Sequence, residues 1–417
     1  MHRIMTPIRL VVALLMLMLA GCVGPPVQRI RLAARPPLIL ISVDGLRADY
    51  LDRGVTPHIA ALAAGGVRAV AMRPSFPSLT FPNHYTLVTG KRPDRHGIVN
   101  NIMEDPSIPG VTFTLSNRAV VADRRWWDQA EPVWVTAEKA GVRTATMFWP
   151  GSEAPIAGVR PSTWLAFDSE MPNEKRVAQV LAWIDAPVRP GFLTLYFDTV
   201  DHAGHEFGPD APETTASVAE VDARIGDLVA GLAARGVAAN IVLVSDHGMA
   251  TVSRDRSIIL SDRLPAGSYR VTSSGAVAGL EALPGKSEVL AAALRHADPH
   301  MRCWRKAAIP PALHYGRNAR VPAFVCLADP GWMIQGLPPR PGMRPMAELG
   351  GMHGYDPAVP DMAAIFVAAG PDLRAGMTIG AFDNVDVYPL LMTLIGVDRR
   401  PSDGNPATLR KVLRSGR

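Results

Sequence analysis

The sequence predicts an α/β fold built on a doubly wound, mostly parallel sheet that lies between helices. The first indication is a set of short, continuous apolar runs, which suit strands covered on both faces. The second is the helical spacing of apolar residues in the segments between them. The third is the alternation of the two kinds of segment, which is typical of parallel sheets with crossover helices. The predicted strands cover residues 38–43, 143–149, 192–197, 241–245 and 362–369.

Three further segments carry helix signals. Thr56 and Pro57 supply an N-cap and a first-turn proline. Segment 214–235 places apolar residues at helical spacing and stops at Gly236, and segment 386–397 predicts a final helix. Residues from about 255 to 350 break this rhythm with extra prolines, a short helix near 287–296 and a β-like piece at 323–327. We therefore expect a small inserted α+β region there.

The first residues carry an export signal. A basic start precedes an apolar run over 10–19 that is too short to span a bilayer as a helix. The run ends in Leu-Ala-Gly-Cys, which resembles the signal of bacterial lipoproteins. We expect a signal peptide over 1–21, lipid on Cys22 and a tether over 22–36, with a plain secretory peptide as the alternative. Because Val23 stands where an aspartate would signal inner-membrane retention, we expect a periplasmic protein anchored in the outer membrane.

Composition and cysteine usage narrow the class of partner. The 417 residues are 48% hydrophobic and 19% charged, with a net charge of +5, which is an ordinary globular composition. No stretch combines Lys and Arg with aromatic residues, so a solvated surface fits the charge better than a nucleic-acid track. Membrane contact is expected only through the lipid. Cys303 and Cys326 remain after Cys22, and in an exported protein they could pair, with two buried thiols as the alternative.

Four short polar clusters follow strand-like runs or end the insertion. Open α/β sheets collect ligands outside the carboxyl ends of their strands, so the clusters should meet at one edge. Their three carboxylates and three imidazoles suit zinc, and six ligands fit two ions with three protein ligands each. Paired ions about 3.5–4 Å apart stabilise the attacking and leaving oxygens at phosphorus. The candidate ligands are Asp44, Asp201, His205, Asp246, His247 and His353.

A candidate nucleophile lies in segment 77–85, PSLTFPNHY. Pro82, two residues after Thr80, suggests that a helix starts here, and a helix N-terminus favours anions. A hydroxyl beside zinc could ionise near neutral pH and attack phosphorus. The plain alternative is that Thr80 only caps the helix. The metal clusters favour the nucleophile.

Eight segments occur in a specific order, and together they carry a family resemblance. They are 42–47 (SVDGLR), 76–84 (FPSLTFPNH), 96–101 (HGIVNN), 149–151 (WPG), 201–205 (DHAGH), 245–249 (SDHGM), 351–355 (GMHGY) and 384–389 (NVDVYP). In this order they resemble the nucleotide pyrophosphatase/phosphodiesterase family of the alkaline phosphatase superfamily. The resemblance spans 38–403 and implies an alkaline-phosphatase-like catalytic domain over 37–417, with the insertion at about 255–350.

The resemblance also assigns roles to the candidate residues. It implies one zinc ion, which activates water, on Asp201, His205 and His353, and a second, which contacts the Thr80 oxygen, on Asp44, Asp246 and His247. It implies a phosphate-oxygen site formed by Asn101 and the backbone N–H of Phe81, with Asn100 as the alternative to Asn101. It further implies that Phe81 and Trp164 stack on a nucleobase, although both rings could simply be packing residues.

The activity implied is hydrolysis of nucleotides or dinucleotides to nucleoside monophosphates through a covalent phosphothreonine. Four alternatives compete with it. A phosphomonoesterase would normally bring a serine and an arginine, and a sulfatase would need a Cys/Ser-x-Pro-x-Arg motif that is absent. A phospholipase-C-like or choline phosphodiesterase would share the metal centre and is the hardest rival. A surface lipoprotein with structural zinc would close each site with four ligands, whereas these clusters leave positions open.

Overall fold

The structure is a computed structural model that describes residues 35–338 and 349–414. Contacts divide the chain into residues 1–35 and a compact unit over Pro36–Arg417, and the second contains every helix and strand of the described residues. The expected signal peptide, the lipidation site at Cys22 and nearly all of the tether lie outside the described residues. Among the described residues, none of the helices combines the length and the apolar character needed to cross a membrane.

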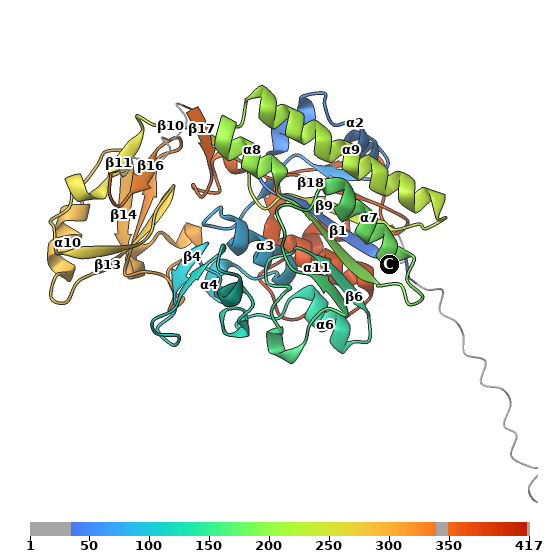
Figure 1. Ribbon diagram of the computed structural model, residues 1–417, viewed down its shortest axis with the longest axis horizontal. Coiled ribbons are helices and arrows are strands. Elements are labelled where there is room, and N and C mark those ends of the chain that lie inside the picture. The colour runs from blue at the N-terminus through green and yellow to red at the C-terminus, as the bar shows by residue number, and fades with distance from the viewer. Residues whose placement is uncertain (1–34, 339–348, 415–417) are drawn as a thin grey trace, which may run out of the picture. The chain divides into compact units, whose positions relative to one another are not determined.

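An eight-stranded sheet forms the centre of the unit, and β1 and β9 lie in its middle (Figure 1). Every residue of β1 and of β9 is buried, as expected for strands covered on both faces. In spatial order the strands are β19 (Met377–Ile379), β2 (Val67–Ala69), β18 (Phe366–Ala369), β9 (Asn240–Val244), β1 (Leu38–Val43), β8 (Phe192–Phe197), β6 (Thr144–Met147) and β7 (Thr163–Leu165). The predicted doubly wound, mostly parallel sheet is confirmed.

One strand of this sheet differs from the prediction. The expected strand over 362–369 begins only at Phe366, because Pro360–Met362 forms a 3-10 turn. It also runs antiparallel to both of its neighbours, β9 and β2. The reversal has a topological cause: the chain re-enters the core at the carboxyl edge of the parallel strands, where His353 lies, and can only run back from there.

Helices cover both faces of the sheet. On one face, α2, α7 and α9 pack against Ile39, Ile41 and Val43, and on the other, α3, α6 and α11 pack near Leu38 and Leu40 (Figure 1). Alternation along β1 sends its side chains to the two cores in turn. The helices are α2 (Pro57–Ala64), α3 (Thr80–Thr89), α4 (Pro93–His96), α5 (Arg118–Val121), α6 (Val133–Lys139), α7 (Asn173–Ile184), α8 (Thr199–Phe207), α9 (Pro212–Ala234), α10 (Ser287–Leu294), α11 (Val387–Ile395) and α12 (Pro406–Arg410).

The segment between β9 and β18 builds small sheets around a third core, drawn in yellow and orange in Figure 1. The chain leaves along β10 and returns along its antiparallel partner β17, and a disulfide joins Cys303 to Cys326 across two neighbouring strands. These strands are β10 (Ala250–Ser253) with β17 (Leu349–Met352), β11 (Ser257–Ile259) with β16 (Met333–Gln335), and β12 (Tyr269–Ser273), β13 (Val277–Ala282), β15 (Phe324–Ala328) and β14 (Met301–Arg305).

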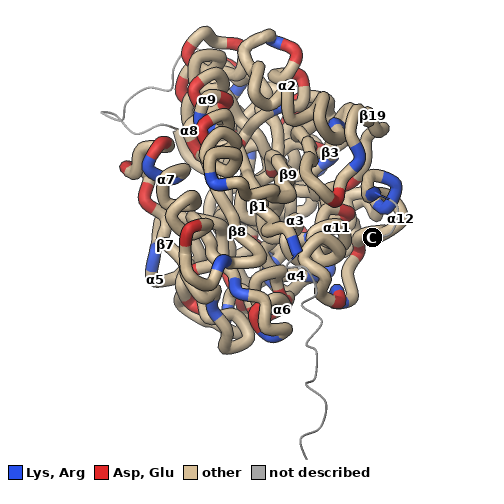
Figure 2. Tube along the Cα trace, turned by 90° about the vertical axis from the view of Figure 1, so that its right-hand side faces the viewer, with Lys and Arg blue, Asp and Glu red and all other residues tan. Residues whose placement is uncertain are grey.

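Two further strand pairs complete the unit: β3 (Met72–Arg73) with β20 (Phe382–Asp383), and β4 (Ile102–Glu104) with β5 (Thr112–Thr114). Lys and Arg are interspersed with Asp and Glu over the face shown in Figure 2. In that view the described residues form no continuous basic stripe.

Candidate active site

The six candidate ligands meet at the carboxyl edge of the parallel strands. Asp44 directly follows β1, and Asp246 and His247 follow β9 after one serine. The sequence placed Asp201 and His205 just beyond β8; they lie one turn apart on α8, which presents both side chains on one face. His353 directly follows β17. Pairing of β17 with β10 puts His353 near the His247 loop, and the two imidazole rings stack with centroids 3.6 Å apart.

One group of possible ligands consists of Asp201, His205 and His353. Their ligand atoms lie within 4.8 Å of one another. Asp201 Oδ2 is 3.4 Å from His205 Nε2, and Asp201 Oδ1 is 3.7 Å from His353 Nε2. The two Nε2 atoms are only 3.1 Å apart. This spacing suits three groups that bind a single cation.

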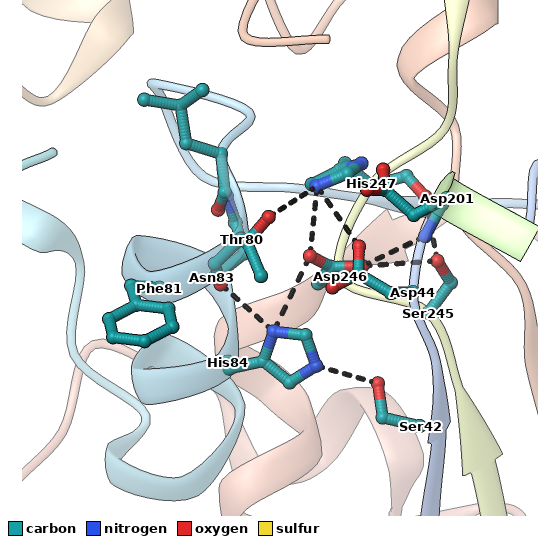
Figure 3. A network of polar contacts seen from close by, with 12 residues as sticks. Ser42, Asp44, Thr80, Phe81, Asn83, His84, Asp201, Ser245, Asp246 and His247 are labelled. Atoms are coloured by element: carbon teal, nitrogen blue, oxygen red, sulfur yellow. Dashed lines mark hydrogen bonds and ion pairs between the residues drawn. The ribbon is translucent and has the colours of Figure 1, made fainter. Parts of the chain in front are cut away.

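A second group surrounds Thr80 (Figure 3). His247 Nε2 lies 2.9 Å from Asp246 Oδ2, 3.4 Å from Asp44 Oδ1 and 3.3 Å from Thr80 Oγ1. Asp44, Asp201 and His247 also form a set whose ligand atoms lie within 4.8 Å of one another. The two groups therefore adjoin, and Asp201 stands between them.

The histidine tautomers show which ring nitrogens face the site. Nδ1 of His205 lies 2.8 Å from the Gly351 carbonyl, Nδ1 of His353 lies 3.0 Å from the Ser78 carbonyl, and Nδ1 of His247 lies 2.9 Å from the Gly248 carbonyl. A carbonyl oxygen only accepts, so each Nδ1 carries a proton, and in the neutral ring Nε2 is the nitrogen with a lone pair for a metal ion. Backbone carbonyls commonly hold metal-binding histidines in this way.

The buried carboxylates of the site also favour bound cations. Asp44 Oδ1, Asp201 Oδ1 and Asp246 Oδ2 accept no hydrogen bond from any described residue, although all three atoms are buried. Burial, together with the charges of Asp246 and Asp201, raises the pKa of Asp44 well above its usual range. Burial, His247 and His205 lower the pKa of His353 well below its usual range, which favours the neutral, metal-binding imidazole. Lone pairs and carboxylates facing one another at this distance fit bound cations.

Thr80 is the first residue of α3, and its hydroxyl lies at the edge of the second group. Pro82 occupies the first turn, where a missing backbone N–H costs nothing. Asn101 Oδ1 accepts the Phe81 backbone N–H at 2.9 Å, so the two expected phosphate-binding groups lie side by side. Asn100 instead points toward Ser273. Of the two asparagines, only Asn101 lines the cavity at Thr80.

That cavity has a volume of about 300 Å³ and an apolar, aromatic wall next to the six ligands. Its lining residues beyond the metal groups include Phe81, Phe148, Trp149, Phe167 and Tyr196. Phe167 contacts Phe148 and Tyr196 edge to face, and its backbone N–H and carbonyl are held by Glu153 and Arg118.

Trp164, which was expected to stack on a nucleobase, does not line this cavity. Trp164 lies on the edge strand β7, is absent from the cavity lining and has the guanidinium of Arg160 near its ring. Alternation turns Trp164 away from Leu165, which packs with Phe167 on the side of α7 and α9. Phe167 thus supplies the aromatic wall that the sequence assigned to Trp164. An aromatic residue just past a short edge strand was the only sequence signal for it.

Sequence reasoning also missed two residues behind the ligands. Tyr196 donates its hydroxyl proton to Asp44 Oδ2 at 2.6 Å. His84 groups spatially with Asp44 and Asp246, but its two ring nitrogens lie 2.9 Å from the Thr80 carbonyl and 2.8 Å from the Ser42 hydroxyl. Because both nitrogens already have partners, His84 is a supporting residue rather than a ligand.

Comparisons with known proteins agree with this architecture. The family described as type I phosphodiesterase/nucleotide pyrophosphatase matches residues 38–356. An uncharacterized pyrophosphatase/phosphodiesterase of Schizosaccharomyces pombe is 38% identical over 387 residues, which cover 88% of this chain and 78% of the yeast protein. The bis(5'-adenosyl)-triphosphatase enpp4 of Xenopus laevis is 34% identical over 385 residues, 91% of this chain and 82% of the frog protein.

Solved structures of similar proteins agree with these sequence matches. Murine ectonucleotide pyrophosphatase/phosphodiesterase 5 superposes with a TM-score of 0.86 at 33% identity, covering 91% of this chain and 100% of the murine chain. An inactive threonine-to-alanine variant of that protein in complex with AMP matches equally well. The chain belongs to the nucleotide pyrophosphatase/phosphodiesterase family and is a hydrolase of that class. The resemblance seen in the motifs is therefore confirmed.

Proposed function

We propose that this protein is a two-zinc phosphodiesterase that hydrolyses nucleotide-like substrates to nucleoside monophosphates, with Thr80 as the nucleophile. One observation carries the proposal. Three imidazole Nε2 atoms, each on a ring whose Nδ1 faces a backbone carbonyl, and three buried carboxylate oxygens converge beside the Thr80 hydroxyl. The mixture of imidazole and carboxylate ligands suits zinc.

The residues divide between two ions. Asp201, His205 and His353 would hold one, and Asp44, Asp246 and His247 would hold the other, next to Thr80. When bound, the ions neutralise the carboxylates, lower the pKa of a contacting hydroxyl and stabilise charge on the attacking and leaving oxygens. Three protein ligands per ion leave positions for substrate, which argues against a closed structural site.

The chain's own residues then account for the chemistry. The Thr80 hydroxyl loses its proton to solvent, and its oxygen attacks phosphorus. A bond from Thr80 Oγ1 to phosphorus forms as the bond to the leaving oxygen breaks, and the leaving oxygen is released to water. The Asn101 amide N–H would hold a non-bridging oxygen, and the Phe81 N–H would join it on exchanging Asn101 Oδ1 for that oxygen. The first turn of α3 also favours the anion. Water then cleaves the phosphothreonine diester, which frees Thr80 and releases the monophosphate.

The aromatic wall supports a nucleotide as the substrate. Phe81 and Phe167 line the same cavity as Thr80, so a base bound there would contact their rings. Stacking tolerates any base, which suits a broad nucleotide specificity. The AMP complex of the murine relative and the printed activity of the frog relative point to the same class of substrate. The inactive variant of the murine protein likewise replaces a threonine.

The test is a substrate panel on the zinc-loaded protein. Bis-nitrophenyl phosphate is compared with nitrophenyl phosphate, and diadenosine polyphosphates with glycerophosphocholine and lysophospholipids. We expect diesters to exceed monoesters by at least tenfold, and nucleotides to exceed choline and lipid substrates. Faster cleavage of the monoester would refute a diesterase, and faster cleavage of choline diesters would identify the phospholipase-C-like rival. Chelator-treated protein, reloaded with zinc, is the control.

We also propose that the protein is exported as a lipoprotein anchored in the outer membrane through Cys22. The support is the sequence of residues 1–22. Mass spectrometry of the N-terminal peptide from outer-membrane fractions should find acyl groups on Cys22. A free thiol at Cys22, or a mature chain beginning elsewhere, would refute the anchor.

A further inference from the structure

His84 is a residue of α3 that contacts β1 and the loop after β9. It is on α3, one turn after Thr80, and its side chain is completely buried. Its imidazole lies between Trp149 and Tyr196, with ring centroids 5.1 and 5.2 Å away, and the Trp149 indole N–H donates to the His84 carbonyl at 3.2 Å. The ring therefore has a fixed position behind the nucleophile.

Each ring nitrogen reaches a different part of the site (Figure 3). Nδ1 lies 2.9 Å from the Thr80 carbonyl and 3.4 Å from Asp246 Oδ2, while Nε2 lies 2.8 Å from the Ser42 hydroxyl. The carbonyl can only accept, so Nδ1 carries the proton and Nε2 accepts from Ser42. Burial lowers the pKa of His84, which is consistent with this neutral form.

The partners of the two His84 ring nitrogens connect this side chain to the reaction. The Thr80 carbonyl belongs to the residue whose hydroxyl attacks phosphorus. Asp246 Oδ2 is the oxygen that lies 2.9 Å from His247 Nε2 in the second ligand group. Ser42 is on β1, two residues before Asp44, so it lies on the same side of the strand. The Nδ1–H of His84 thus holds the first turn of α3, which carries Thr80, near the Asp246 carboxylate. The hydroxyl of Ser42 fixes the tautomer of the His84 ring.

We propose that His84 is a positioning residue whose Nδ1–H holds the Thr80 carbonyl, and with it the first turn of α3, beside the Asp246 carboxylate, and that Ser42 fixes this orientation of the ring. The proposal deepens and rests on the proposed phosphodiesterase function. It assigns His84 no contact with substrate. Its effect is on the placement of the Thr80 hydroxyl, where an error of about 1 Å costs on the order of 100-fold in rate.

Two amide variants separate positioning from general packing. In His84→Asn, the amide N–H can occupy the place of Nδ1 and still donate to Thr80. In His84→Gln, the amide reaches toward Ser42 and the donor to Thr80 is lost. We expect His84→Gln to lower kcat by roughly 10- to 100-fold with KM and zinc content nearly unchanged, and His84→Asn to keep kcat within about fivefold. If His84 only fills space, the Asn variant should have the lower kcat, because the shorter side chain leaves the larger cavity. A kcat for His84→Gln equal to or above that for His84→Asn would overturn the proposal.

His96 provides a matched control, since it is another fully buried histidine packed against α3. There Nδ1 accepts the Ile98 N–H, and Nε2 lies 3.1 Å from the Pro82 carbonyl. Gln rather than Asn preserves the contact with the helix at this position. We expect both His96 variants to lose thermal stability and to keep kcat within about threefold. A large loss of kcat at His96 would mean that disturbing any buried histidine packed against α3 lowers turnover, which would overturn a specific role for His84.

A measurement of the His84 tautomer needs no turnover. Nitrogen-15 NMR of labelled histidines in the zinc-loaded protein should show His84 with its proton on Nδ1 from pH 6 to 9, and Ser42→Ala should identify and shift that signal. A proton on Nε2 would overturn the proposal. An inactive wild type would instead refute the phosphodiesterase function, so the two failures are distinguishable.

Discussion

The bond between Tyr196 and Asp44 gives the sharpest quantitative prediction. The Tyr196 hydroxyl donates to Asp44 Oδ2 at 2.6 Å, and both residues are buried. This bond leaves Asp44 Oδ1 as the oxygen that faces the ligand group. Tyr196→Phe removes the donor but keeps the ring, which packs edge to face against His84 and Phe167. The variant therefore frees the carboxylate to rotate without opening a cavity.

The expected size follows from two independent figures. A hydrogen bond to a charged group contributes about 1.5–3 kcal/mol. Loss of a residue that orients a metal ligand typically weakens metal binding by roughly 10- to 100-fold, which is about 1.4–2.8 kcal/mol. The two ranges agree. Loss of the bond also removes an interaction that lowers the pKa of Asp44, so protons compete better for the carboxylate and the defect should grow as the pH falls.

The assay is competition for zinc against a chromogenic chelator, read as two dissociation constants. We expect the weaker-binding step of Tyr196→Phe to lose 10- to 100-fold in affinity, with the larger loss at pH 6 than at pH 8. Tyr85→Phe is the control, because that buried hydroxyl donates to the Trp127 and Ala130 carbonyls, away from the ligands. Zinc affinity within twofold of wild type in Tyr196→Phe would refute the reasoning.

The remaining predictions concern the nucleophile, the substrate wall and acid stability. Thr80→Ala should lose more than about 1,000-fold in turnover yet keep two zinc ions, and retained turnover would remove Thr80 as the nucleophile. Phe167→Ala should lower kcat/KM roughly tenfold or more for nucleotides but little for nitrophenyl diesters, whereas Trp164→Ala should affect neither; equal losses on both substrates would argue against stacking. Burial lowers the pKa of His96 to about 3, so the unfolded chain takes up the proton first and stability is lost as the pH falls below about 6.5. His96→Gln should remove roughly 2 kcal/mol of the stability lost between pH 7 and pH 5, measured by urea unfolding, and an unchanged pH dependence would contradict the assignment.

The parts of the fold that the sequence predicted share one physical property. β1, β8 and β9 are buried on both faces, so their sequences are continuous apolar runs that are visible without any tertiary information. Ligands gather where such strands end, and Asp44 and Asp246 were located from that rule alone. Long amphipathic helices such as α9 were equally visible, because one face of the helix is apolar over many turns.

The parts that were missed depend on contacts between distant segments. Trp164 and Phe167 are both aromatic and three residues apart, and only the pleat of a three-residue edge strand decides which one faces the cavity. Tyr196 reads as one more apolar residue of β8, because its partner Asp44 is 152 residues away. His353 itself was a candidate ligand, but the antiparallel pairing of β17 with β10 that brings it to the site has no local sequence signal.

The central claim is that six side chains hold two divalent cations beside Thr80. Anomalous diffraction at the zinc edge, from crystals of the zinc-loaded protein, tests this directly. The account predicts two peaks per chain about 3.5–4 Å apart, one among Asp201, His205 and His353 and the other among Asp44, Asp246, His247 and the Thr80 hydroxyl. A single peak, or peaks away from these residues, would contradict it.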